Sequence, residues 1–500
     1  MQNLGFQKFL QNLSTIIHNL SSLIRRLYYQ PETDRARSRK FTRNFFLHFH
    51  SARIHKYSLK PTYTWGLGLI AFYLFIIEVV TGILLMFYYT PSVERAYASI
   101  EDITYVVMAG SFIRNMHRWA AHGMVLVVIL HMARVFYTGS YLKGRSFNWL
   151  IGVALLLVTL LLSFSGYLLP WDQLAYWAVT IGANIAGSAT ELTDALGLTG
   201  FFDPGRLIKK ILLGSYSVGQ DALIRFYLLH IIFLPLICTI LIAVHFWRIR
   251  KDGGLTRPEN ANELILREEG ATNDIIQKER NLSELERKSR HLILSWPTAL
   301  WAEAAVFMLT LAVLTIISYF FDAPLKNIAN PAVPENPAKS PWYFLGLQEL
   351  VSYSAFTGGI GIPVLITLAL ISIPYLDKED HHIGTWFSGF GGSKVTLQSL
   401  VYALITTTGL LIIIIQFGWI RNWFPTIPQF IIILINPGTL LAIIYSIWSL
   451  FILKRTESTR MAAIAMFTCI LVGFCLFTIL GMWFRGPNWE FFWTPAQWPV

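Results

Sequence analysis

Nine long apolar stretches constrain this chain more than any other feature of its sequence. A helix that crosses a bilayer core of about 30 Å needs about 20 mostly apolar residues. The 500 residues are 54% hydrophobic and 14% charged, which excludes soluble, disordered and disulfide-framework classes. We expect an all-α integral membrane protein with about nine transmembrane helices. The stretches lie near 64–89, 113–137, 148–169, 223–249, 297–321, 360–376, 397–420, 429–453 and 462–484.

Basic residues predict the orientation of these spans. The net charge is +11, and most lysines and arginines fall in 1–63, in 248–296 and in the short loops on the same side. The positive-inside rule places this side, with the N-terminus, on the cytoplasmic, electrically negative face. The charge therefore indicates membrane orientation, with no nucleic-acid partner. Residues 3–29 combine apolar side chains at helical spacing with cations, which predicts an interfacial helix on lipid headgroups.

Four histidines form two matched pairs in the second and fourth spans. His117 and His131 are fourteen residues apart, and His230 and His245 are fifteen apart. At about 100° and 1.5 Å per residue, each pair shares one helix face and is separated by roughly 21 Å. Both spans cross in the same direction, so His117 is level with His230 and His131 with His245. Such pairs can ligate two haem irons; four histidines bonded to backbone are the alternative.

Glycines repeat the same period in the neighbouring spans. Gly68 and Gly82 are fourteen residues apart in the first span, as are Gly152 and Gly166 in the third. A missing side chain lets a flat ring system approach the helix backbone. Ordinary packing of small residues between helices would give the same pattern.

Two arginines stand one turn outside the histidines of the second span. Arg114 precedes His117 and Arg134 follows His131. Haem propionates would need cationic partners at these levels. The alternative is arginines that extend to the membrane interface.

Several motifs together resemble cytochrome b of the Rieske/cytochrome b complexes. The fifteen-residue spacing resembles the plastid-type form, and the region from Trp296 to about Leu376 is similar to its companion subunit IV, here fused. The motifs are Arg114-Asn-Met-His117-Arg-Trp, His131-Met-Ala-Arg134, Ser165-Gly-Tyr-Leu-Leu-Pro-Trp-Asp-Gln173 and Arg225-Phe-Tyr-Leu-Leu-His230. We expect these parts: a basic arm 1–60, a four-helix dihaem domain 61–250, a basic linker 251–295, a subunit IV-like domain 296–390, and additional helices with an aromatic tail 391–500.

The resemblance implies a redox function. His117 and His230 would ligate a low-potential haem on the positive side, and His131 and His245 a high-potential haem on the negative side. Bifurcated quinol oxidation would occur in a pocket framed by Tyr167, by Trp177 and by the loop between the fifth and sixth spans. Electron transfer through two non-covalent b haems would be coupled to proton translocation. The family also implies a homodimer of complexes.

The chain departs from the family at the quinol motif. It reads Ser340-Pro341-Trp342-Tyr343 where the family usually has Pro-Glu-Trp-Tyr. Quinol oxidation releases two protons, and a proline cannot accept one. Glu349, two turns beyond Tyr343, or Glu78 in the first span could substitute. In the family such changes tend to accompany low-potential quinones, so we expect menaquinol.

Cysteines limit what the chain can do alone. Cys238, Cys469 and Cys475 lie in apolar runs without CxxC, CxxCH or zinc spacing. No cysteine lies in the first span, so we expect no covalent c-type haem. A Rieske iron–sulfur subunit and a cytochrome c-type subunit are therefore expected partners.

Other assignments stay open at this stage. The quinone-reduction site is poorly marked; proton donors could be Arg248, Glu303, Asp377 or the His381-His382 pair. A proton-coupled secondary transporter with buried histidines is an alternative function, as is a haem-b membrane anchor of a dehydrogenase. The fused chain and its basic N-terminus favour a bacterial cytoplasmic membrane.

Overall fold

The computed structural model describes residues 51 and 53–499, with the isolated positions 14, 33 and 36. The interfacial helix expected over 3–29 lies outside the described residues except for Ser14. Among the described residues, nine helices are long and apolar enough to cross a membrane, which confirms the expected number. They are Leu67–Met86, Gly110–Tyr137, Ser146–Tyr167, Gln220–Lys251, Leu300–Phe320, Thr357–Leu376, Phe390–Trp423, Pro437–Thr456 and Thr459–Phe484.

The chain divides into two compact units. The smaller comprises 1–65, 249–255 and 260–305, and the larger comprises 66–248, 256–259 and 306–500. Where described, the smaller unit has a two-stranded antiparallel sheet that pairs Arg53 with Leu294 and His55 with Leu292. Its elements are β1 (Arg53–His55), η2 (Lys56–Leu59), α3 (Pro61–Thr64), α13 (Ala261–Glu268), α14 (Asn273–Arg280), α15 (Glu284–Ser289), β2 (Leu292–Leu294) and η4 (Ser295–Ala299).

The region expected as a basic linker folds into this smaller unit around a buried polar chain. His55 Nδ1 accepts from the Tyr57 amide, so Nε2 is the nitrogen that donates to Asn262 Oδ1 at 2.8 Å. Asn262 Nδ2 in turn donates to Glu279 Oε1 at 2.7 Å. Glu279, which is 1% exposed, is also bonded to Arg290. Asn262 and Glu279 of the expected linker thus have hydrogen-bond partners within this smaller unit.

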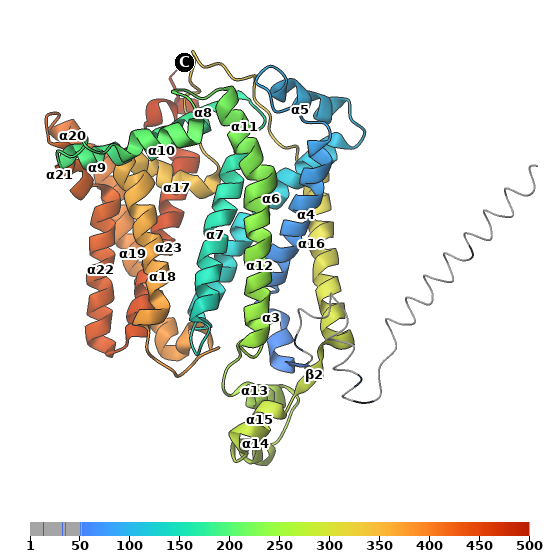
Figure 1. The fold of residues 1–500 in the computed structure, drawn as a ribbon. Coiled ribbons are helices and arrows are strands. Elements are labelled where there is room, and N and C mark those ends of the chain that lie inside the picture. The colour runs from blue at the N-terminus through green and yellow to red at the C-terminus, as the bar shows by residue number, and fades with distance from the viewer. Residues whose placement is uncertain (1–13, 15–32, 34–35, 37–50, 52, 500) are drawn as a thin grey trace, which may run out of the picture. The chain divides into compact units, whose positions relative to one another are not determined.

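The larger unit holds the spanning helices (Figure 1). Helix α4 packs along α6, α18 packs on α7, and α23 packs on α17, α19 and α22. Helices α8, α9 and α10 lie at the same end of the spans as α17 (Figure 1). The helices that lie in or extend into this unit are α4 (Leu67–Met86), α5 (Ala96–Tyr105), α6 (Gly110–Tyr137), α7 (Ser146–Tyr167), α8 (Gln173–Gly187), α9 (Ala189–Ala195), α10 (Pro204–Leu213), α11 (Gln220–Leu228), the π-helical segment η3 (Leu229–Phe233), α12 (Leu234–Lys251), α16 (Leu300–Phe320), α17 (Trp342–Val351), η5 (Thr357–Gly361), α18 (Ile362–Leu376), η6 (Trp386–Ser388), α19 (Phe390–Phe417), α20 (Ile420–Trp423), α21 (Gln429–Leu434), α22 (Pro437–Thr456), α23 (Thr459–Ile479), η7 (Leu480–Phe484), η8 (Pro487–Trp489) and η9 (Pro495–Gln497).

The eighth span begins later than the sequence predicts. The apolar run expected from residue 429 is divided into the short α21 and the spanning α22. Asn436 is fully buried and its side chain accepts from the Gly438 amide at 2.8 Å, while Pro437 occupies the first helical position. An Asn cap followed by Pro starts a helix, so this pair overrides the continuous hydrophobicity around it.

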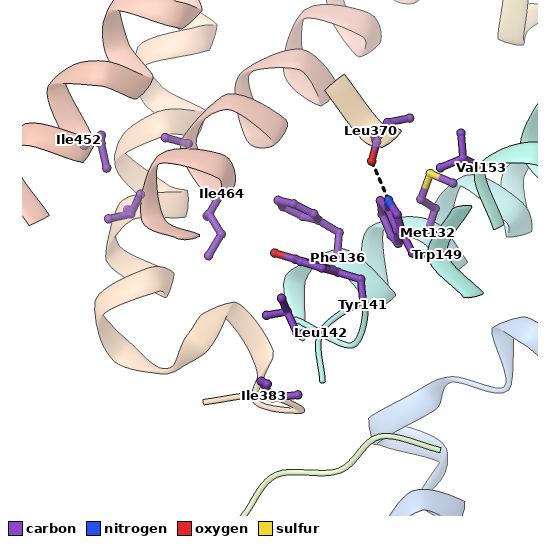
Figure 2. Close-up of a cluster of buried hydrophobic side chains, with 12 residues drawn as sticks. Met132, Phe136, Tyr141, Leu142, Trp149, Val153, Leu370, Ile383, Ile452 and Ile464 are labelled. Carbon is purple, nitrogen blue, oxygen red and sulfur yellow. Dashed lines mark hydrogen bonds between the residues drawn. The ribbon is translucent and has the colours of Figure 1, made fainter. Parts of the chain in front are cut away.

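A hydrophobic cluster joins the first helices of the larger unit to the last ones (Figure 2). Phe136 of α6 stacks on Tyr141 in the loop that follows, at 5.9 Å between ring centroids. Trp149 of α7 donates its indole N–H to the Leu370 carbonyl of α18 at 2.7 Å. Ile452 of α22 and Ile464 of α23 complete the same cluster. The regions expected as separate domains on either side of residue 296 thus share one core here.

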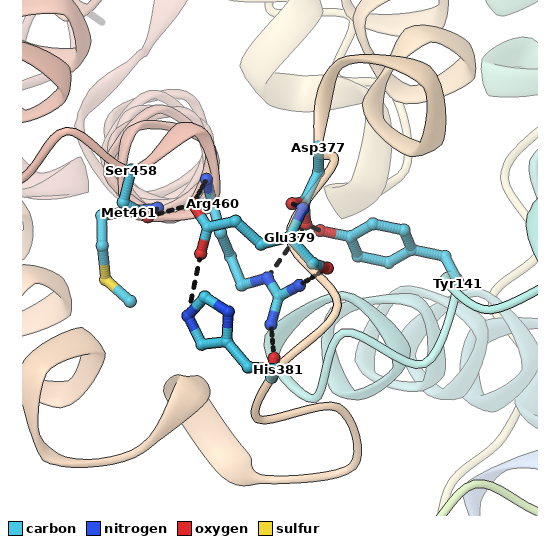
Figure 3. A network of polar contacts seen from close by, with 7 residues as sticks. All are labelled: Tyr141, Asp377, Glu379, His381, Ser458, Arg460 and Met461. Atoms are coloured by element: carbon cyan, nitrogen blue, oxygen red, sulfur yellow. Dashed lines mark hydrogen bonds and ion pairs between the residues drawn. The ribbon is translucent and has the colours of Figure 1, made fainter.

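Next to this cluster, Arg460 at the start of α23 forms a buried ion pair (Figure 3). Its Nε lies 3.0 Å from Asp377 Oδ2, which also accepts from the Tyr141 hydroxyl at 2.6 Å. The guanidinium further donates to the carbonyls of Glu379 and His381. One arginine, whose side chain is 2% exposed, therefore ties the start of α23 to the loop after α18, and Asp377 extends this contact to Tyr141 in the loop after α6.

Removing this arginine should destabilise the protein strongly. Arg460→Met leaves Asp377 buried without its cation, a change that typically costs about 3–5 kcal/mol. We expect a clear fall in the thermal unfolding midpoint of the detergent-purified protein. Arg455→Met, which removes an exposed cation from the end of α22, is the control and should change the midpoint little. Equal midpoints for the two variants would contradict this account of the network.

Candidate functional site

The His117 ring of α6 faces the His230 ring across the helix bundle. The ring centroids are 6.2 Å apart and the ring planes are nearly perpendicular, at 83°. His117 Nδ1 lies 3.0 Å from Glu78 Oε2 and 2.9 Å from the Thr81 hydroxyl, both on α4. A carboxylate only accepts, so Nδ1 carries the proton and Nε2 is left as a potential metal ligand.

His230 is held in a similar way from helix α7. Its Nδ1 lies 3.1 Å from the Leu162 carbonyl oxygen and 3.2 Å from the Ser165 hydroxyl. The carbonyl again fixes the proton on Nδ1 and leaves Nε2 for a ligand. Both rings of this pair therefore have the orientation typical of metal-binding imidazoles.

The second pair, His131 and His245, repeats the arrangement one tier away. The ring centroids are 6.5 Å apart with the planes at 77°. Fourteen helical residues separate His131 from His117 on α6, a rise of roughly 21 Å. The structure thus brings together the four histidines as the two cross-helix pairs that the sequence predicts.

The spacing within each pair fits a metal between two axial imidazoles. A metal–nitrogen bond of about 2.0–2.1 Å on each side, plus roughly 1.1 Å from nitrogen to ring centre, separates the ring centres by about 6.3 Å. The observed 6.2 and 6.5 Å agree with this value. Among the described residues, no group of three or more His, Cys, Asp or Glu could hold a metal ion by itself. The residues present therefore suit an iron that brings its own equatorial ligands, as a haem does.

A π-helical segment explains the unequal histidine spacing. His230 lies in η3, where the hydrogen bonds span five residues instead of four. One inserted residue of this kind restores the face that a regular helix would lose over fifteen residues. The π-helical segment therefore brings His230 and His245 towards the same helix face despite the fifteen-residue spacing. The fifteen-residue spacing is itself the sequence signal of this segment.

Three of the four predicted glycines lie directly against the histidine rings. A Cβ at Gly68 would be 3.1 Å from His131 Cε1, and one at Gly82 would be 3.3 Å from His117 Cε1. At Gly166 the distance to His230 Cε1 would be only 2.5 Å, which real Cβ atoms do not show. A Cβ at Gly152 would meet no atom within 4 Å. Gly68 and Gly82 of α4 and Gly166 of α7 thus leave space for the histidine rings. The role of the glycines towards a haem plane remains a prediction.

The two flanking arginines are both buried. Arg114 donates to the carbonyls of Ala323 and Pro324, at 2.9 and 2.7 Å, and so anchors the turn after α16. Arg134 is 7% exposed. Their pairing with haem propionates remains a prediction.

The Pro341-Trp342-Tyr343 motif lies against helix α6. Pro341 is the N-cap of α17, and the Trp342 indole N–H donates to His122 Nδ1 at 3.2 Å. The Tyr343 ring lies 5.9 Å from the His122 ring. Burial raises the pKa of the Tyr343 phenol, which keeps it protonated and able to donate. His122 is thus a neighbour of the motif that its sequence position alone does not reveal.

The loops that frame the motif are bonded to each other. Asp172 caps α8 by accepting from Ala175 N and also accepts from the Lys326 amide, at 2.8 and 2.9 Å. The Gln173 amide donates to the Asn327 carbonyl at 2.8 Å. The loop between the third and fourth spans is therefore fixed to the loop between the fifth and sixth.

Tyr167 and Trp177 take different places around this region. The Arg118 guanidinium lies over the Tyr167 ring at 4.8 Å, one turn of α6 before His122. Trp177 lies on α8, beside Tyr176, and packs on the hydrophobic cluster of that loop. Tyr167 is thus linked through Arg118 to the part of α6 that contacts the motif. The roles of Tyr167 and Trp177 towards quinol remain predictions.

The two candidate acids differ in how their oxygens are used. Glu349 is 0% exposed; Arg485 and Tyr353 donate to Oε1, and Arg485 and Trp489 donate to Oε2. Glu78 uses Oε2 toward His117, whereas its buried Oε1 has no hydrogen-bond partner among the described residues. Both oxygens of Glu349 are therefore used in contacts within the fold, whereas one oxygen of Glu78 has no hydrogen-bond partner among the described residues.

On the opposite side, two of the candidate quinone-reduction residues have partners within the larger unit. Asp377 is committed to Arg460 and Tyr141 (Figure 3). His381 is largely exposed, with Nε2 3.4 Å from Glu379 Oε2. The role of all the candidate residues in quinone reduction remains a prediction.

Comparison with known proteins identifies relatives of this region. The family model described as cytochrome b/b6/petB matches residues 55–253. The cytochrome b6 of Heliobacterium mobile is 44% identical over 188 residues, which are 38% of this chain and 81% of that protein. The cytochrome b6 of Euglena gracilis is 44% identical over 187 residues, 37% of this chain and 81% of that protein.

A solved structure extends the likeness beyond residue 253. A chain of a hyperthermophilic respiratory Complex III is similar with a TM-score of 0.59, covering 79% of this chain and 92% of that chain. The sequence identity is 24%, so this likeness shows the fold alone.

A methyl group at Gly166 should disturb one histidine pair selectively. Gly166→Ala places its Cβ against His230 and must displace that ring. We expect the haem content of the purified protein to fall, or one of two haem absorption bands to shift, while the other stays unchanged. Gly409→Ala on α19, where a Cβ meets nothing within 4 Å, is the matched control. Unaltered spectra for both variants would show that His230 holds no haem.

Proposed function

The chain belongs to the cytochrome b/b6 family, and from this premise we propose that it is the cytochrome b subunit of a quinol-oxidising Rieske/cytochrome b complex. The observation that carries the proposal is the pair of imidazole tiers at 6.2 and 6.5 Å in a bundle of membrane-spanning helices. A simple haem-b anchor would not need the helices that follow the fourth span, nor the buried contacts that tie them to the first four.

The cofactors we propose are two non-covalent b-type haems. If two histidines hold each iron, each haem would supply one-electron transfer without oxygen binding. His117 with His230 would hold the low-potential haem on the positive side, and His131 with His245 the high-potential haem on the other. Hydrogen bonds at Nδ1 of His117 and His230 keep those rings in the orientation that presents Nε2.

Quinol would be oxidised beside α17, where Trp342 and Tyr343 meet α6. Tyr343 remains a hydrogen-bond donor, and the indole of Trp342 fixes His122 by donating to its Nδ1. The proton on the neutral His122 ring is then on Nε2, which can donate to a quinol or quinone oxygen. Pro341 stands where the family usually has an acid, and the resemblance implies that such a change accompanies lower-potential quinones, so we take menaquinone as the substrate.

The reaction we propose is bifurcated. One electron of quinol would leave to a Rieske iron–sulfur subunit and then to a cytochrome c-type subunit, and the other would cross the membrane to a quinone bound on the negative side. Two protons leave on the positive side, so turnover translocates protons. The absence of CxxC and CxxCH from this sequence supports separate partner subunits.

The integral membrane protein is proposed to reside in a bacterial cytoplasmic membrane as part of a homodimer of complexes. The distribution of lysine and arginine supports a cytoplasmic N-terminus. The histidine spacing is of the plastid type, and a subunit IV-like region follows in the same chain. This is consistent with a fusion of the cytochrome b6-like and subunit IV-like parts, which other members hold in separate chains.

Rapid anaerobic mixing of the purified complex with a menaquinol analogue tests this function. Absorbance should report b-haem reduction, faster than with a ubiquinol analogue of equal chain length. Trp342→Ala should slow reduction at least tenfold, because it removes the contact that positions His122 and the start of α17.

Trp423→Ala, which alters an exposed tryptophan of α20, is the control and should leave the rate unchanged. If dithionite reduces the haems but no quinol does, quinol oxidation by this chain is excluded. A preference for ubiquinol would reject the menaquinol assignment alone.

A further inference from the structure

The last membrane-spanning helix has a buried arginine at each of its ends. Arg460 at the start of α23 pairs with Asp377, and Arg485 just after η7 pairs with Glu349 of α17. Their side chains are 2% and 9% exposed, and those of the two carboxylates are 1% and 0% exposed. A buried ion pair tolerates little movement because either charge alone would be left uncompensated. Helix α23 is therefore fixed at both ends.

The Arg485 contact is the more elaborate of the two and bears on the quinol motif. Arg485 Nε lies 2.9 Å from Glu349 Oε2, Nη2 lies 2.5 Å from Oε1, and Nη1 donates to the Trp489 carbonyl. The Trp489 indole N–H donates to Oε2 of the same carboxylate at 2.8 Å. Glu349 lies two turns after Trp342 on the same ten-residue helix. The segment after the last span, residues 485–499, which we call the tail, thus holds α17 through a carboxylate whose two oxygens both accept hydrogen bonds.

The same tail also holds the loop before α17. Asn488 N donates to Asn336 Oδ1 at 2.6 Å, and Asn336 Nδ2 donates to Asn488 Oδ1 at 2.9 Å. Lys339 Nζ donates to the Met482 carbonyl at 2.9 Å. These contacts lie three to six residues before Trp342, on the other side of the motif from Glu349.

Within the motif region, the loop is fastened to the helix by Gln348. Its side-chain oxygen accepts from the Ser340 amide at 2.8 Å, and its side-chain nitrogen donates to the Ala338 carbonyl at 2.7 Å. The loop and α17 therefore move as one piece. A displacement of Glu349 would be transmitted to Trp342 and Tyr343.

Close packing adds to this frame. A Cβ at Gly346 of α17 would lie 3.0 Å from the Thr478 hydroxyl, and one at Gly481 would lie 3.4 Å from Leu345. Asn488 and Trp489 adopt positive φ values of 56° and 62°, which non-glycine residues keep only where the surroundings impose them. The tail and the end of the last span thus pack specifically against α17, and the backbone conformation of the tail depends on that contact.

We propose that Arg485 is a positioning residue for the quinol-oxidation site, acting through Glu349 with support from Asn488 and Trp489. The tail beyond the last span would hold the Trp342–Tyr343 turn where quinol binds. The proposal rests on the proposed function of this site. It also assigns Glu349 to structure, because its two oxygens already accept four hydrogen bonds, from Arg485, Tyr353 and Trp489, which leaves no open acceptor site for a quinol proton.

Steady-state quinol oxidation by the whole purified complex tests the proposal. Arg485→Gln should lower kcat/KM for the menaquinol analogue at least tenfold, with a raised KM, because α17 loses its anchor. The haem content and the dithionite-reduced spectrum should equal those of the parent protein. Arg485→Lys should have a smaller loss of kcat/KM than Arg485→Gln, because lysine keeps the positive charge but not the bidentate contact with Glu349. Arg421→Gln, an exposed arginine of α20, is the matched control.

A second variant keeps the proposal testable if Arg485→Gln does not fold. Asn336→Ala with Asn488→Ala removes an exposed polar contact and should raise KM two- to threefold with the haems intact. Parent-like KM and kcat in the folded Arg485→Gln protein, or in this double variant, would overturn the proposal. Failure of the parent complex itself to oxidise quinol would instead refute the proposed function.

Discussion

Two pairs of facing imidazoles, 6.2 and 6.5 Å apart, are the constraint on which the rest of this structure depends. Helix α6 and the η3–α12 helix must place two rings each at two matching levels, and features of the neighbouring helices serve that requirement. Glycines on α4 and α7 give the rings space, Glu78 and the Leu162 carbonyl fix two of their tautomers, and one π-helical turn corrects the phase of α12. None of these features is needed by a bundle that only spans a membrane.

Charge pairing organises the helices that follow. In a lipid environment an unpaired arginine or carboxylate is costly, so buried charges there need partners. The last helix meets this requirement at both ends, with Arg460 on Asp377 and Arg485 on Glu349. The additional C-terminal helices are thereby joined to the loop and helix that carry the quinol motif. We regard this region as the support of the site rather than an appendage.

Much of the fold and the histidine site could be predicted from the sequence because their signals are periodic. Spans follow from apolar length, and the histidine and glycine spacings follow from helical geometry. The predicted start of the eighth span is wrong because Asn436 and Pro437 begin the helix locally, although the residues before them are also apolar. Contacts such as Trp342 with His122, or Arg485 with Glu349, join residues far apart in the chain. Only the folded structure reveals which partner each buried charge or indole has.

The most direct test of the account is the haem content of the purified chain, with a dithionite-reduced-minus-oxidised spectrum. The parent protein should contain two non-covalent b-type haems. His131→Ala and His230→Ala should each lose one, a different one in each case, whereas His122→Ala should retain both. A parent protein without haem, or variants that keep both haems, would contradict the assignment of the imidazole pairs and favour a transporter with buried histidines.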